Sequence, residues 1–204
     1  MFIPPDRPWC YIGQANLKAA IGELEAERPD VSVVIGWKPF LLRPNMPEDG
    51  QPKAPNTPDN PRVGGRLKAA GAAAGVDFTG KTDRSPNAIK AHTLAKYFEG
   101  ESQQDSLMNV MFRHYFTDGK YPDSANLREA AVEVGVTGTE LDEAIAFMED
   151  NRNQKAVRSE ASNYSANGIS GVPYFFFNEQ PAFSGAQPAA MLKKMILQVA
   201  DAKS

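Results

Sequence analysis

The sequence predicts an α/β protein in which a small unit of sheet and helices is interrupted by an all-helical insertion. Residues Val31–Trp37 and Tyr174–Phe177 have the β-branched and aromatic composition typical of buried strands. Between them, residues 61–167 repeat their apolar side chains at helical spacing almost throughout. Because strands at the two ends of the chain must share one sheet, we expect residues 1–60 and 168–204 to form the sheet-containing domain and residues 61–167 to form the inserted helical domain.

The composition excludes several classes of function. Of the 204 residues, 22 are Lys or Arg and 25 are Asp or Glu, so the net charge is −3, and no basic stretch offers a surface for nucleic acid. The longest apolar runs fall far short of the ~18 residues that a membrane helix needs. The N-terminal residues lack the pattern of a signal peptide, so we expect a cytoplasmic protein. One cysteine and two histidines are too few for a zinc site, so no metal is expected.

The first expected element is a helix over residues 13–28, because Leu17, Ile21 and Leu24 recur at helical spacing. Pro29 ends this helix, and the strand Val31–Trp37 follows it. Seven of the 16 prolines then lie between residues 39 and 61, which predicts a surface loop.

Local signals place helix boundaries within the block that follows. Prolines suit a first helical position, small polar side chains can cap a helix, and glycine ends one. In chain order, these signals are Pro61 and Pro86 as helix starts, Ser124 or Asn126 as a cap, Gly135 as an end, and Thr139 with Asp142 as a capping box.

The helical block carries enough apolar residues on its helical faces to form a cluster of its own. Each large side chain that becomes buried contributes ~1.5–3 kcal/mol, so such a cluster could hold a subdomain together. The residues expected in it are Leu94, Phe98, Met111, Phe112, Phe116, Leu127, Leu141 and Phe147.

The last forty residues predict a hairpin followed by a helix. Tyr174–Phe177 is an aromatic strand, Asn178-Glu179 is a turn, and Ala182–Ser184 can pair back as the second strand. Pro188 then opens a terminal amphipathic helix.

One stretch fits the phosphate-binding pattern G-x-x-x-x-G-K-[ST], namely Gly75–Thr82. That loop requires a buried strand before it and a helix directly after it. Here an Ala-rich helical segment precedes the stretch, and Pro86 follows within four residues. We therefore predict a solvated loop and no nucleotide.

The two histidines, His92 and His114, lie on predicted helices among apolar neighbours. Neither has a nucleophile nearby in the sequence. We interpret both as structural side chains rather than catalytic bases.

Two stretches indicate a site. Cys10 would lie in the first turn of the first helix, where the helix dipole stabilises a thiolate, although a lone cysteine is equally consistent with a small buried apolar residue. Pro173 directly precedes the aromatic strand, where an X–Pro bond can be cis. A cis-proline that faces a cysteine at a helix start recurs in thiol-redox folds.

These motifs carry a resemblance that extends over nearly the whole chain. The sequence resembles the DsbA-type thioredoxin-fold family, and within it the FrnE-like branch, whose active site reads Cys-Pro-Trp-Cys-Tyr-Ile-Gly. The matching stretches are Pro8–Gly13, Trp37–Leu42, Pro44–Pro47, Arg84–Asn87 with Ala91-His92, Gly168–Pro173 and Ser184–Gln187.

The resemblance implies a thioredoxin-like sheet-and-helix domain interrupted by an all-helical insertion domain, and thiol–disulfide oxidoreductase activity on client protein or peptide thiols. It implies catalysis at Cys10, a cis bond at Val172-Pro173 close to Cys10, and substrate contacts from Pro8, Trp9, Val172 and Pro173. It implies no metal or organic cofactor, with glutathione as an optional co-substrate, and it predicts no particular oligomeric state.

The sequence departs from this family at two places. Arg7 stands where the family has its first, nucleophilic cysteine, so that Cys10 corresponds to the second, resolving one. Six residues precede Arg7, and two of them are prolines, so the central strand that the family places there is expected to be rudimentary or missing. Such a chain would be a shortened product or the result of a misplaced start.

Three functions follow as hypotheses. Cys10 could act alone and form mixed disulfides with glutathione or a client thiol, helped by the charge of Arg7. The groove beside Val172-Pro173 could instead bind an extended peptide by strand addition, with apolar contacts from Trp9 and Tyr174 and with the redox function lost. The third hypothesis is a glutathione-dependent transferase or isomerase, as in the kappa-class relatives, which have a serine in place of Arg7.

Overall fold

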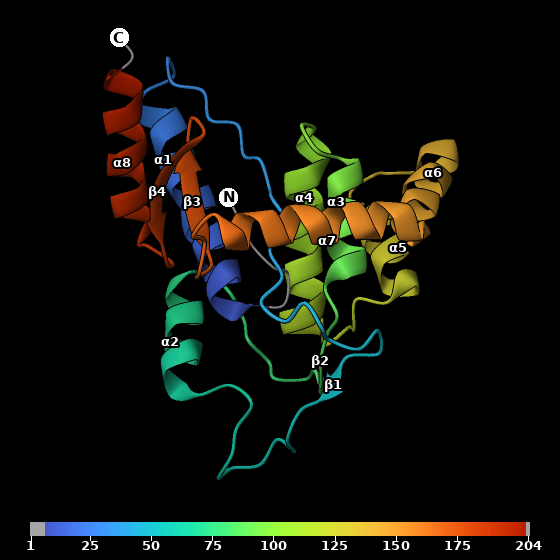
Figure 1. Ribbon diagram of the computed structural model, residues 1–204. Helices are drawn as coiled ribbons and strands as arrows, with labels where there is room; N and C mark the ends of the chain where they lie inside the picture. The colour runs from blue at the N-terminus through green and yellow to red at the C-terminus, as the bar shows by residue number, and fades with distance from the viewer. Residues whose placement is uncertain (1–6, 203–204) are drawn as a thin grey trace.

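The computed structural model describes residues 7–202 (Figure 1). One end of the molecule contains α1, α8 and the hairpin β3–β4, the other contains α3 to α6, and α7 runs between the two ends. The helices are α1 (Pro8–Glu27), α2 (Gly65–Ala73), α3 (Ile89–Tyr97), α4 (Ser102–Arg113), the π-helical turn η1 (His114–Asp118), α5 (Ser124–Glu133), α6 (Gly138–Glu149), α7 (Asn151–Ala166) and α8 (Ala189–Asp201); the strands are β1 (Gln51–Pro52), β2 (Arg84–Ser85), β3 (Tyr174–Phe177) and β4 (Gln180–Ser184).

The hairpin at the C-terminal end forms as its turn residues predict. β3 and β4 pair antiparallel, and Asn178 and Glu179 between them have φ values of 49° and 66°. Two consecutive residues with positive φ give the turn twist that matches right-handed strands. Phe175 stacks on its cross-strand partner Phe183 with ring centroids 4.7 Å apart, which fixes the register.

Within residues 7–202, the predicted strand Val31–Trp37 pairs with no other strand. Its burial alternates as in a strand: Val31, Val33 and Ile35 are half-buried against the smaller core, while Ser32 and Val34 are exposed. A strand also needs a neighbour at hydrogen-bonding distance, and a cleft of about 440 Å³ separates this segment from β3. The segment is therefore extended but has no paired strand among residues 7–202, because the pattern of side chains alone cannot supply a neighbouring chain.

The two strand segments at the ends of the chain consequently do not share a ladder within residues 7–202, where the sheets are the pairs β1–β2 and β3–β4. The strand expected before Arg7 would fall on residues 1–6, which lie outside the described residues.

Two of the predicted proline starts were wrong. Pro61 lies in the loop before α2, and α3 begins three residues after Pro86. The start of α3 is instead fixed by Asn87, whose side-chain oxygen accepts a hydrogen bond from the Ile89 amide at 3.0 Å while its amide nitrogen donates to the Met46 carbonyl at 2.7 Å.

The caps of the two following helices also differ from the prediction. Asp123, rather than Ser124 or Asn126, caps α5, and its carboxylate accepts from the Asn126 amide at 2.9 Å. Gly135 ends this helix at a φ of 88°, as predicted. The N-cap of α6 is Thr137, so the expected capping box at Thr139 lies inside the helix.

Two apolar cores share α1. Cys10, Tyr11 and Ile12 belong to the larger core with the helical block, whereas Leu17 and Leu24 belong to the smaller core with α8 and β3. Six of the eight residues expected to form the insertion cluster are buried in the larger core, and Phe116 and Phe147 are half-buried. That cluster was expected to be separate, but Tyr11 stacks on Phe112 at 5.1 Å. The first turns of α1 present apolar side chains to α4, so the helical block completes its core with residues from the other end of the molecule.

Within residues 7–202, every helix is too short or too polar to cross a bilayer. The cytoplasmic location remains a prediction from the sequence.

We expect Phe112→Ala to lower the free energy of unfolding by about 3–5 kcal/mol, because the buried ring leaves a cavity between α1 and α4. Phe147→Ala is the matched control, since this ring is half-buried and its loss should cost less than half as much. Urea denaturation of both variants measures the difference. Equal losses would show that the contact between α1 and α4 is not central to the larger core.

Candidate functional site

Residues Arg7–Cys10, the stretch that corresponds to the family motif, form the start of α1. Arg7 is the N-cap in extended conformation, Pro8 is the first helical residue, and the Cys10 amide donates to the Arg7 carbonyl at 3.0 Å. Proline suits this position because its missing N–H would have no partner there. The helix therefore begins five residues earlier than the apolar spacing predicts, and the motif is its first turn.

Cys10 lies inside the protein. Its exposed fraction is 0%, it forms no disulfide, and it packs in the larger core. Of the two interpretations that the sequence leaves open, this burial favours a packed apolar residue. The reactivity of the thiol stays a prediction.

The bond between Val172 and Pro173 is cis, which confirms the prediction. The Pro173 ring lies against Gly13 on α1: a Cβ at Gly13 would lie 3.0 Å from Pro173 Cγ. Val172 packs against the same core that contains Cys10. The structure thus brings the start of β3 onto α1 one turn after Cys10, and a side chain at position 13 would displace it.

Pro8 and Trp9, the other predicted contact residues, lie nearer the surface. Pro8 is half-buried, and Trp9 is 37% exposed with the Arg66 guanidinium 5.4 Å from its ring centroid. The nearest hollow to them is a cavity of about 180 Å³ whose lining includes Arg7 and Pro8.

That cavity contains charged residues that sequence reasoning missed. Arg7, Arg43, Lys53 and Arg62 line it, together with apolar side chains. Arg43, Lys53 and Arg62 are spread along the proline-rich segment, and no spacing or motif in the sequence connects them. Their convergence depends on how the loop folds back onto α1 and η1.

The cleft of about 440 Å³ is the second hollow near the motif. Its long walls are residues 31–36 on one side and residues 175–178 on the other, with Leu17 and Ile196 from helices α1 and α8. It adjoins β3, the strand that begins next to Pro173.

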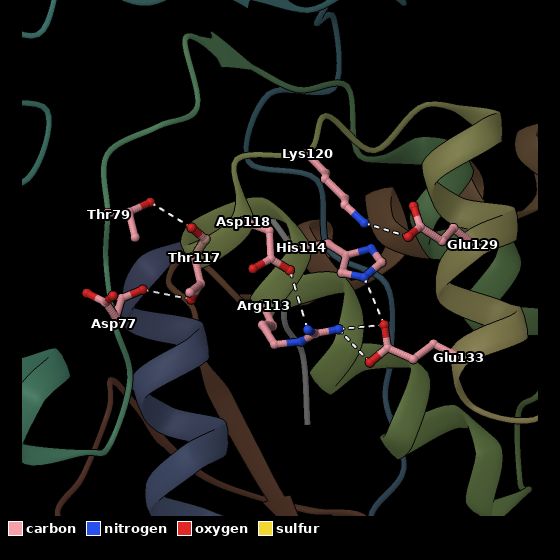
Figure 2. Close-up of polar contacts among 9 residues, drawn as sticks. All are labelled: Asp77, Thr79, Arg113, His114, Thr117, Asp118, Lys120, Glu129 and Glu133. Carbon is pink, nitrogen blue, oxygen red and sulfur yellow. Dashed lines mark hydrogen bonds and ion pairs between the residues drawn. The ribbon is translucent and has the colours of Figure 1, made fainter.

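A network of polar contacts holds η1 in place (Figure 2). Arg113 and His114 both bind Glu133 on α5, and the His114 Nε2 lies 3.1 Å from a carboxylate oxygen. On the other side, the Thr117 hydroxyl donates to the Asp77 carbonyl at 2.7 Å, and the Thr79 hydroxyl donates to the Thr117 carbonyl at 2.8 Å. These contacts fix the two aromatic residues of η1, Tyr115 and Phe116. Both line the cavity of about 180 Å³ that contains the four cationic residues, which we call the basic cavity.

Both histidines have structural contacts, as predicted. His92 is 4% exposed, and its Nε2 lies 3.1 Å from the Phe40 carbonyl, which ties α3 to the loop after Trp37. Burial lowers the pKa of His92 to about 4, and the hydrogen bond to Phe40 only partly opposes this shift. His114 is equally buried and is part of the η1 network.

The stretch Gly75–Thr82 has neither neighbour that a phosphate-binding loop requires. Helix α2 precedes it and strand β2 follows it, so no helix N-terminus faces the loop. Elsewhere in residues 7–202, no three histidine, cysteine or acidic side chains gather as ligands for a metal ion.

Fold and site together define a thioredoxin-fold protein in which a cis-proline packs against the first helix near a motif cysteine. The family model of the DSBA-like thioredoxin domain matches residues 8–197, and the chain belongs to this family of thiol–disulfide oxidoreductases. No curated protein matches the sequence.

Two solved structures illustrate the similarity. A probable DsbA oxidoreductase from Streptomyces coelicolor is 25% identical with a TM-score of 0.78, over 98% of this chain and 88% of that one. A 2-hydroxychromene-2-carboxylate isomerase is 15% identical with a TM-score of 0.69, over 99% of this chain and 95% of that one, and shares the fold.

We expect the stability of the protein to fall as the pH is lowered from 6.5 to 4. His92 is neutral in the folded state down to about pH 4, while an unfolded histidine binds a proton near pH 6.5. In this window the unfolded state holds one more proton, so this group lowers the free energy of unfolding by about 1.4 kcal/mol per pH unit. The variant His92→Gln retains a donor for Phe40 and removes the titration. Urea denaturation at several pH values should give a shallower slope for the variant, and parallel slopes would contradict the assignment.

Proposed function

We propose that this member of the DsbA-like family does not perform dithiol exchange and acts by binding extended polypeptide segments. The observation that carries the proposal is the first turn of α1, where Arg7 is the N-cap and the single cysteine, Cys10, is fully buried. Dithiol exchange needs one thiolate to attack and a second to resolve the mixed disulfide, and one buried thiol supplies neither step efficiently.

Chemistry by Cys10 alone is the weaker alternative. A client thiol or glutathione would reach its sulfur only after the first turn of α1 opens, because the side chain is 0% exposed. Exchange of a mixed disulfide would then be limited by that opening.

The cleft supports the binding part of the proposal. Its two long walls, residues 31–36 and 175–178, are both extended chain, and the half-buried Val33, Ile35 and Phe177 supply apolar contacts. The main chain of residues 32–35 makes no hydrogen bond to another described residue. An extended peptide can add to such an edge through its main chain and place alternate side chains on the apolar wall.

We expect the wild-type protein to be nearly inactive in the reduction of insulin by dithiothreitol and Arg7→Cys to accelerate it at least tenfold. The substitution places a second thiol three residues before Cys10, at the half-buried N-cap of α1. The double variant Arg7→Cys/Cys10→Ser is the control and should lose most of the gain. Wild-type activity equal to that of Arg7→Cys would refute the loss of dithiol exchange.

We expect the cleft to bind an extended peptide and Val199→Trp to weaken that binding at least tenfold. Val199 on α8 lines the cleft, and an indole there would fill part of its volume. Val132→Trp on α5 is the matched control, because Val132 is 47% exposed and lies outside the cleft. Fluorescence anisotropy with a labelled heptapeptide rich in Val and Thr measures the affinity. No binding to the wild type, or equal binding to both variants, would remove the cleft from the proposal.

A further inference from the structure

We propose that the basic cavity beside the start of α1 binds a small organic phosphate, a monoester dianion with an apolar group. This site goes beyond polypeptide binding and is distinct from the cleft, because the two hollows share no lining residue.

The cavity concentrates positive charge from four separate parts of the chain. Arg7 comes from the N-cap of α1, Arg43 from the loop after Leu42, Lys53 from the residue after β1, and Arg62 from the loop before α2. No acidic side chain is among the described residues that line it. In a space of about 180 Å³, such a set of like charges favours an anion as the occupant.

Elsewhere in the described chain, several cations pair with carboxylates. Arg28 pairs with two aspartates, Arg113 pairs with Asp118 and Glu133, and Lys193 pairs with two glutamates. In contrast, Arg43 and Arg62 contact no carboxylate within the described part of the chain. In a protein whose net charge is −3, two guanidinium groups at one cavity without a carboxylate partner among residues 7–202 are not a consequence of overall composition.

Arg62 is held in position by the main chain. Its Nε donates to the Ala54 carbonyl at 3.1 Å and one terminal nitrogen donates to the Gly80 carbonyl at 3.3 Å. A guanidinium has five N–H donors, so these bonds orient the group and leave donors for a ligand. The planar fork suits the oxygens of a phosphate.

The remaining lining residues define the neutral part of the ligand. Leu67, Phe78 and Phe116 form an apolar wall, and the rings of Phe78 and Phe116 meet edge to face at 5.4 Å. Ser85 is also a lining residue, and its hydroxyl has no hydrogen bond to another residue in the range 7–202. A ligand with a charged head and one small apolar group fits this lining.

The wall is rigid on the side of η1. The Thr79 amide donates to the Phe116 carbonyl at 3.2 Å, and the network of Figure 2 anchors Thr117 to Asp77. The cavity is smaller than the ~300–1,000 Å³ typical of drug-sized ligands, which selects a compact molecule with a single ring or a short chain.

Isothermal titration calorimetry with phenyl phosphate at pH 7.5 and low salt tests the site. We expect one molecule to bind per chain, with affinity at least tenfold above that of neutral phenol, of benzoate and of inorganic phosphate. Affinity should fall with added salt because the contact is electrostatic. Glutathione, which has carboxylates but also an ammonium group, should bind more weakly than phenyl phosphate.

Arg43→Gln is the informative variant, because Arg43 is exposed and its replacement should leave the fold intact. This variant should lower the affinity for phenyl phosphate at least tenfold. Arg128→Gln on α5, which is not among the residues that line the cavity, should leave the affinity unchanged. Absence of binding by the wild type, unchanged affinity in Arg43→Gln, or equal affinity for phenol would overturn the proposal. Tighter binding of benzoate or glutathione would refute the phosphate class. The peptide affinity of the same preparations, and its loss in Val199→Trp, reports separately on the cleft.

Discussion

The position of helix α1 between two cores is the constraint on which the rest of the structure depends. Its first turns bury Cys10, Tyr11 and Ile12 against the helical block, and its later turns bury Leu17 and Leu24 against α8 and β3. A shift of the helix along its axis would disturb both cores at once, because protein interiors are closely packed. The motif at its start is therefore placed by contacts at both ends of the molecule, and the two hollows beside it are fixed with it.

The close contact between Gly13 and Pro173 links this helix to the C-terminal hairpin. It brings β3 near the motif while the apolar side of β3 faces the smaller core through Phe175. On its other side, β3 lines the cleft whose opposite wall is formed by residues 31–36. The packing that buries the cysteine thus also places two extended segments along the walls of the cleft, which is the arrangement on which the proposed peptide binding rests.

Local signals in the sequence predicted the parts of the structure that depend on local interactions. The turn at Asn178-Glu179 and the end of α5 at Gly135 follow from the residues at those positions, while the cis bond at Pro173 was predicted from the family resemblance. Two features depended on contacts between distant segments and were missed. Residues 31–37 alternate like a strand but lack a paired neighbour among the described residues, and the cations of the basic cavity become neighbours only when the proline-rich loop folds back. The family resemblance supplied the fold but could not reveal the cavity, since the substitution at Arg7 departs from the family pattern.

That substitution also connects the motif to the basic cavity. The N-terminus of a helix carries a partial positive charge, and a cation placed there is disfavoured by about 0.3–1 kcal/mol when exposed. Arg7 is such a cation, at the N-cap of α1. The resemblance to the FrnE-like branch predicts a cysteine at this position, whose thiolate would interact favourably with the helix dipole. An anion in the cavity would restore that interaction, because its charge would lie beside both Arg7 and the start of α1. On this proposal, Arg7 makes the start of α1 part of a site that favours a negative ligand.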